Sequence, residues 1–232
     1  MAKYPPSQVA VVAPRYCAPC AVDMSVVRKV MTMSRGSFDV ADLSGNILFK
    51  VRGSVLSLRD RRVLFDAAGN PLLTLQRKLV SMHRRWKAYR AESCDPRDLL
   101  FSVKRSSLVQ LMGMRLHVYL ANNTGEECCD FRVEGSWSRN NCVIYAGYSN
   151  SVVTKVGDLL YRRTCALLIS YLGLILPPKM QMHEKHSVQS FLLGKDRFMV
   201  TVYPGVDAAF IVAIIIILDS MDKEDGGSDR EV

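Results

Sequence analysis

The segment AAFIVAIIIIL, residues 208–218, restricts the possible folds of this chain more than any other segment. It has no polar face, so a folded protein has to enclose it on all sides. As a helix it would span about 16 Å, roughly half of the ~30 Å hydrocarbon core of a bilayer. Its β-branched residues favour a strand, but its length and the preceding Asp207, a suitable helix N-cap, favour a helix. We therefore predict a core helix with no transmembrane role, whose structural core residues include Phe210, Ile211, Ile214, Ile215 and Leu218.

The rest of the chain is typical of a β protein. The pattern D-x-x-G-N-x-L occurs twice, from Asp42 and from Asp66, and its Gly-Asn pairs tolerate the positive φ of tight hairpin turns. Further strand-like segments are 72–79, 84–90, 99–103, 115–119, 129–134, 141–145, 187–193 and 198–202. We predict a mainly β fold, a closed antiparallel barrel of about 12 strands around the buried helix.

The two ends of the chain differ in composition from this barrel domain, which we assign to residues 25–221. Residues 1–24 contain four prolines, which favour an extended arm lying on the domain. Residues 222–232 are acidic, contain glycine and are poor in apolar side chains. We expect this tail to be disordered.

Several long strings resemble one known family. They are FDVADLSGNILFKVRGS and DRRVLFDAAGNPLLTL, then LLFSVKRSS and FRVEGSW, and finally GKDRFMVTVYPGVDAAFIVAIIIILDSM. In this order they resemble the plant LURP-one-related family over nearly all of residues 9–221. The resemblance implies the Tubby C-terminal-like fold, a closed antiparallel barrel threaded by a hydrophobic C-terminal helix.

One segment departs from that family. In relatives, the strand ending near Val153 passes almost directly into a segment like 180–189, whereas about 154–179 intervene here. This insert carries the apolar run 165–176 and ends in Pro177-Pro178. One hypothesis is that it reflects an unspliced or mispredicted coding segment, and the rival hypothesis is a short hydrophobic hairpin that touches a membrane.

Composition limits the setting more than the function. The seven cysteines form an odd set with no signal peptide before them, which indicates a reducing compartment and not secretion. We expect the protein in the cytoplasm, with the membrane periphery and the nucleus as alternative locations. The formal charge of +9 attracts anionic partners, whether membrane lipid, acidic protein or nucleic acid. We expect a monomer that needs no cofactor.

Two short motifs imitate reactive or metal sites. Cys17-Ala-Pro-Cys20 lies in the proline-rich arm, without the strand and helix that activate a redox motif. His183 and His186 are three apart in a strand-like segment, so they project to opposite faces, unlike the histidines of a zinc protease. With no triad, paired acids or phosphate loop beside them, the chain is not expected to be an enzyme or to bind a metal.

A basic cluster is the best candidate site. Nine basic and three acidic residues lie between positions 77 and 105, a net charge of +6 on neighbouring strands. Alternation directs Trp86 to the core and Arg85 and Lys87 outward, where they can bind phosphate-bearing headgroups. The predicted patch is Arg77, Lys78, Arg85, Lys87, Lys104 and Arg105.

The resemblance and this patch together favour a non-enzymatic interaction module. It would bind anionic membrane lipid such as phosphoinositide, or a protein partner, and the family's name suggests plant stress or defence signalling. Tubby proteins bind such lipids through basic barrel residues, an analogy of fold alone. Nucleic-acid binding and a ligand-free scaffold are the alternatives, and a charge run is often only a solvated face.

Overall fold

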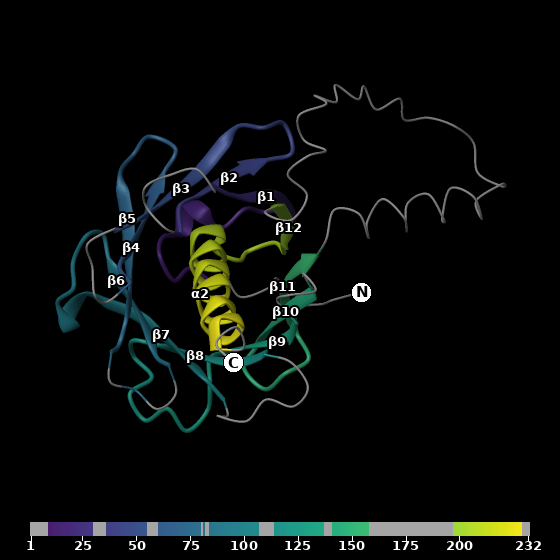
Figure 1. Ribbon diagram of the computed structural model, residues 1–232. Coiled ribbons are helices and arrows are strands. Elements are labelled where there is room, and N and C mark those ends of the chain that lie inside the picture. The colour runs from purple at the N-terminus through teal and green to yellow at the C-terminus, as the bar shows by residue number, and fades with distance from the viewer. Residues whose placement is uncertain are drawn as a thin grey trace.

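Within the described residues of the computed structural model, twelve antiparallel strands close into one barrel around a long C-terminal helix (Figure 1). The structure describes residues 9–29, 36–54, 60–79, 81, 84–106, 114–136, 141–157 and 197–228. Each strand pairs with its neighbours in the chain, and β1 closes the ring by pairing with β12. The predicted closed barrel with an enclosed C-terminal helix is confirmed.

The elements follow one another as a simple meander with short 3₁₀ turns. In chain order they are η1 Pro14–Tyr16, β1 Val22–Arg28, β2 Phe38–Asp42, β3 Ile47–Gly53, β4 Arg62–Asp66, β5 Pro71–Arg77, β6 Trp86–Arg90, η2 Pro96–Asp98, β7 Leu99–Arg105, β8 Met114–Leu120, β9 Phe131–Ser136, β10 Asn141–Ala146, β11 Val152–Gly157, β12 Arg197–Val202 and α2 Ala208–Ser228.

The repeated turn motif builds two hairpins of the same local design. Gly45 and Gly69 have φ near +90°, the left-handed region that favours glycine. In each turn the aspartate that ends the first strand accepts a hydrogen bond from the amide of the asparagine four residues later, at 2.9 Å for Asp42 and 2.8 Å for Asp66. The repeated D-x-x-G-N-x-L motif therefore forms the same turn structure twice.

Helix α2 fills the barrel. Every residue from Ala209 to Leu218 is buried, and the inward side chains of the strands pack around them. The Phe210 ring lies between those of Phe101 and Phe131, with both centroid distances 5.0 Å. No helix in the described part of the chain combines the length and the apolar character needed to cross a membrane.

The connections of an up-and-down barrel alternate between its two ends. Helix α2 begins at the end that carries the turns 42–46 and 66–70, which we call the turn end. It leaves at the opposite end, where β5 connects to β6 and β7 to β8, which we call the exit end. The N-terminal arm contacts the start of α2, because Val9 and Cys17 form bridges with Val206 and Asp207.

Some predicted boundaries need correction. Helix α2 continues to Ser228, so part of the acidic tail that we expected to be disordered is helical; a helix already nucleated in the core extends at little cost. β1 begins inside the segment assigned to the arm, and β11 includes residues 154–157 of the proposed insert. The rest of that insert and the predicted strand 187–193 lie outside the described residues.

Candidate anion-binding surface

A row of polar side chains crosses the outer face of the barrel from β5 to β9. Lys104 pairs with His117, which pairs in turn with Arg132. On the other side of Lys104, the register places Arg85 opposite it, and the amide of Lys78 donates to the Arg85 carbonyl at 2.8 Å. Directly opposite residues of neighbouring strands project to the same face. These five residues therefore form one continuous row.

The row faces outward because its neighbours in sequence face the core. His117 stands between Leu116 and Val118, both fully buried, and Arg85 and Lys87 flank the fully buried Trp86. The predicted inward position of Trp86 is confirmed. With the two further cations on this face, the surface has six, which we call the basic belt: Lys78, Arg85, Lys87, Lys104, Arg115 and Arg132.

Among the described residues, Glu126 and Glu134 are the carboxylates whose ion pairs with the belt the structure shows. Glu134 lies 3.3 Å from the Arg115 guanidinium and 3.4 Å from that of Arg132. Glu126, from the loop between β8 and β9, binds both Arg85 and Lys104. Six cations against two acids leave a net charge of +4 on this face.

The contacts of Glu126 with the belt strongly lower the pKa of its carboxyl group. Its two oxygens accept from both Nη atoms of Arg85, at 2.7 Å for Nη2, and from Lys104 Nζ at 2.8 Å. The hydrogen bonds from Arg85 are the main reason that the pKa of Glu126 falls to about 2. The same contact raises the pKa of Arg85. At neutral pH this cluster is one carboxylate shared by two cations.

Aromatic rings lie beneath two of these cations. Lys104 Nζ lies 4.6 Å from the centre of the Tyr119 ring, and the Arg132 guanidinium lies 4.3 Å from that of Tyr145. Burial lowers the pKa of His117, and the neighbouring charge of Lys104 acts in the same direction. His117 therefore adds a polar but neutral group to the row at pH 7.

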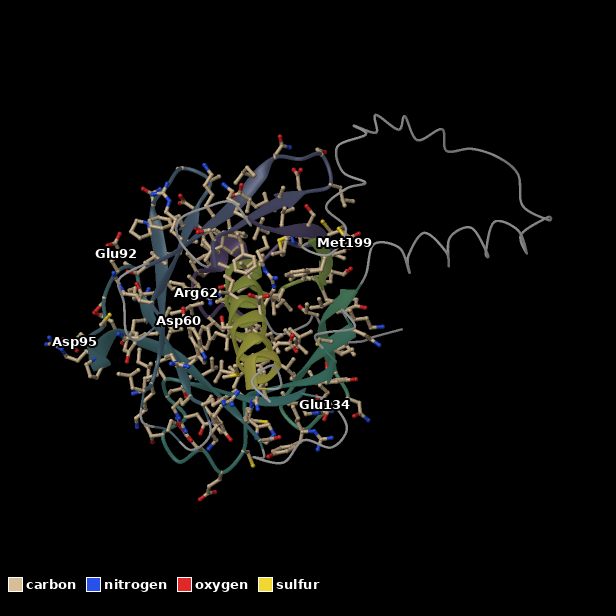
Figure 2. The ribbon with its side chains drawn as sticks, viewed as in Figure 1. Asp60, Arg62, Glu92, Asp95, Glu134 and Met199 are labelled. Carbon is tan, nitrogen blue, oxygen red and sulfur yellow. The ribbon has the colours of Figure 1, made fainter. Side chains whose placement is uncertain are left out.

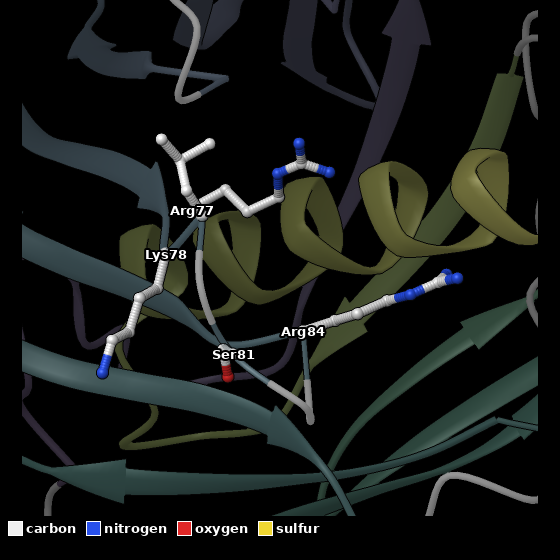
Figure 3. A pocket seen from close by; sticks show the side chains of 5 residues that line it. Arg77, Lys78, Ser81 and Arg84 are labelled. Carbon is white, nitrogen blue, oxygen red and sulfur yellow. The ribbon is translucent and has the colours of Figure 1, made fainter.

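A cavity of about 320 Å³ lies at the exit end, where β5 passes into β6 (Figure 3). It is lined by Arg77, Lys78, Leu79, Ser81 and Arg84. Leu79 is a large apolar side chain left 53% exposed among these cations. The belt thus ends at a basic pocket with an exposed leucine on its rim.

The structure brings together four of the six residues of the predicted patch and separates the other two. Arg105 is 8% exposed and faces the interior, where it donates to the Met221 carbonyl at 3.5 Å. Arg77 pairs across the strands with Trp86, and Figure 3 shows Arg77 and Lys78 leaving β5 in opposite directions. Grouping all six on one surface was wrong, because adjacent residues of a strand project to opposite faces.

Several arginines instead face the interior of the barrel. Arg28 forms an ion pair with the buried Asp219. Arg62 lies inside the ring of strands, whereas Glu92 and Asp95 lie at its periphery (Figure 2). The Arg62 guanidinium contacts Asp60 and stands 5.7 Å from the centre of the Trp86 ring. Arg28 neutralises a buried carboxylate of α2, and Arg105 donates to an α2 carbonyl, so we assign these inward arginines a structural role.

The described residues of the other sequence motifs do not assemble into a site. Cys17 contacts the Val9 carbonyl at 3.6 Å, and Cys20 is exposed in the arm. Cys128 is exposed and Cys129 is buried, and both lie in the loop before β9. His183 and His186 lie outside the described residues. Within the described residues, no three His, Cys, Asp or Glu side chains gather closely enough to hold a metal ion.

Sequence reasoning missed two of the six cations of the belt and the carboxylate that binds two of the others. Arg115 and Arg132 lie on β8 and β9, outside the charge-dense stretch, and Glu126 lies in a loop. Their alternation with apolar residues could have shown that both arginines face outward. Only the register between strands shows that they continue the row.

The barrel with its enclosed helix is of the Tubby C-terminal-like class. A family model described as LURP-one-related matches residues 22–164 and 153–219, and the chain belongs to this family. LURP-one-related protein 15 of Arabidopsis thaliana is 47% identical over 93% of this chain and 87% of its own length. LURP-one-related protein 10 of the same plant is 44% identical over 94% and 98%. A crystal structure of an Arabidopsis thaliana protein, 38% identical, covers 92% of this chain and 98% of its own, with a TM-score of 0.64.

Proposed function

We propose that the protein is a non-enzymatic interaction module whose basic belt docks on membranes containing phosphate-rich anionic lipids, such as phosphoinositides. The observation that carries this proposal is the unbroken outward row on five neighbouring strands. At about 4.8 Å per strand, the row extends over roughly 20 Å, wide enough to meet more than one headgroup. Each Lys or Arg held near an anionic leaflet contributes about 1 kcal/mol, so binding requires such a cluster.

The basic pocket at the exit end supports docking of this same surface on a membrane. Leu79 projects beside Lys78, so a membrane that attracts the cations would also receive an apolar side chain. A basic surface with an adjacent apolar anchor is typical of proteins that lie on a bilayer.

A protein partner in stress or defence signalling stays a prediction. Binding of nucleic acid is disfavoured by the shape of the surface. The major groove of DNA admits a helix or a two-stranded ribbon. In the described part of the chain the only α-helix is inside the barrel, and every strand is paired on both sides. The belt is therefore a broad curved wall without a groove-reading element.

The test compares vesicles of neutral lipid, vesicles of neutral lipid with added phosphoinositide, vesicles of matched charge carrying phosphatidylserine, and double-stranded DNA, all at one salt concentration. We expect binding to the phosphoinositide vesicles, and we expect Lys87→Glu to weaken it about tenfold or more.

The matched control is Arg97→Glu, which changes the net charge equally but lies in η2, at the turn end, with a 90% exposed side chain. We expect this variant to change binding less than threefold. Equal losses for the two variants, or equal binding to every anionic partner, would indicate only the diffuse field of a basic protein and would refute a defined surface.

A further inference from the structure

The centre of the belt is occupied by a side chain of the protein itself. Arg85 and Lys104 come from neighbouring strands and converge on the two oxygens of Glu126. Arg85 also donates to the Ser102 hydroxyl at 3.2 Å, and Lys104 rests over the Tyr119 ring. The two cations are therefore held in place by barrel residues and do not depend on Glu126 for their position.

Glu126 is attached less firmly than the residues it contacts. It lies in a loop, and its φ of +51° is in the left-handed region, which costs a non-glycine residue about 1–2 kcal/mol. The side chains of Arg85, Glu126 and Lys104 are 21%, 24% and 22% exposed, so the cluster opens to solvent. A competing anion can reach the two cations from outside.

The arrangement suits a phosphate better than it suits a carboxylate. An arginine fork with a nearby ammonium presents donors to two or three oxygens at once. A phosphate monoester carries a charge of about −1.5 to −2 and three acceptor oxygens, against −1 and two for Glu126. The phosphate and the Glu126 carboxylate bind the same donors, so the binding of one excludes the other.

We propose that Arg85, Ser102 and Lys104 form a phosphate-monoester subsite within the belt, and that Glu126 closes it until a phosphate displaces the carboxylate. The inference rests on the proposed function, because it names how one headgroup phosphate is received and what regulates its entry. Opening requires Glu126 to swing away, and the rest of the loop can keep its conformation, because the Asn123 side-chain amide donates to the Cys128 carbonyl at 2.8 Å and to Asp130 at 2.9 Å.

The test measures binding of inorganic phosphate and of a soluble inositol trisphosphate by calorimetry, followed by binding to phosphoinositide vesicles. We expect Glu126→Gln to bind the soluble inositol phosphate at least tenfold more tightly than the wild type, because the competitor is removed. Glu126→Asp keeps the charge but is one methylene too short to hold both cations, so we expect a gain of several-fold. Adding Lys104→Gln to Glu126→Gln should abolish the gain.

The matched control is Glu134→Gln, which removes the same charge from the same face and leaves Arg85 and Lys104 untouched. We expect it to alter phosphate binding less than twofold. If Glu126→Gln gains no more than Glu134→Gln, the gain reflects net charge and the closed subsite is refuted. If Glu126→Gln fails to fold, Glu126→Asp decides alone, and wild-type affinity in that variant overturns the proposal.

The outcomes separate this inference from the proposed function. Wild-type binding to phosphoinositide vesicles without a specific gain at Glu126 keeps the membrane function and removes the gate. A specific gain for the soluble ligand, with no vesicle binding by any variant, keeps the gated phosphate subsite and removes the membrane.

Discussion

The buried carboxylate of Asp207 joins the start of α2 to the N-terminal arm. Its Oδ1 accepts from the amides of Ala209 and Phe210, which caps α2 as the sequence predicted. Its Oδ2 accepts from the amides of Val12 and Ala13, at 2.7 and 3.0 Å, which fixes the arm at the turn end. Burial raises the pKa of this carboxyl, while the four amides act in the opposite direction.

Replacing Asp207 with alanine should therefore lower the free energy of unfolding by roughly 3–5 kcal/mol. Loss of a cap costs about 1 kcal/mol, and each buried amide left without an acceptor costs about 1–3 kcal/mol. Urea unfolding measures the change. Asp42→Ala is the control, because its carboxylate also bonds to backbone and side-chain groups but is exposed, so the loss should be below about 1 kcal/mol. Similar losses for the two variants would contradict the role given to Asp207.

Residue-level prediction succeeded where the local sequence contains the cause. Asp207 follows Pro204-Gly205 and precedes an apolar run, so its capping role is visible in the sequence alone. Its bonds to the arm are not visible, because nearly 200 residues separate Val12 from Asp207. The position of Arg105 was predictable from strand alternation, but charge density was given too much weight.

At the level of elements, α2 shows why enclosure determines the conformation of an ambiguous segment. Its isoleucines have a high strand propensity. In the barrel every strand already pairs on both sides, so a further strand would have no partner for its backbone groups. A helix satisfies those groups within itself and leaves only side chains to be covered.

Ile215 tests this account of the core. It is fully buried, so Ile215→Ala should lower the free energy of unfolding by about 2–5 kcal/mol, and Ile215→Asp should prevent folding. Circular dichroism and urea titration follow both variants. Leu43→Ala, at a 70% exposed position, should change stability by less than about 0.5 kcal/mol. A cooperatively folded Ile215→Asp protein would mean that α2 is not enclosed.

Element-level prediction was most successful where turns carry their own signal. The two hairpins and the helix start follow from Asp, Gly and Asn at fixed positions. The helix end was missed because composition indicated disorder after Met221, whereas the backbone remains helical to Ser228. Helix propensity describes an isolated segment. It does not take into account that the residues after Met221 continue a helix that is already formed.

On the scale of the whole molecule, the barrel register creates the candidate site. Lys78, Lys104 and Arg132 come from parts of the chain that share no motif, and strand pairing alone places them in one row. The sequence alone was sufficient to predict the fold class and the sign of the surface charge. It was insufficient for the position of Glu126, because loop placement depends on contacts with two other strands.

Hydrogen exchange with and without phosphoinositide vesicles tests most directly whether the belt is the docking surface. We expect slower exchange in the connection from β5 to β6 and in the loop 121–130, and unchanged exchange on the opposite wall formed by β1, β2 and β3. Protection of that opposite wall, or equal protection around the whole barrel, would contradict the proposed orientation on the membrane.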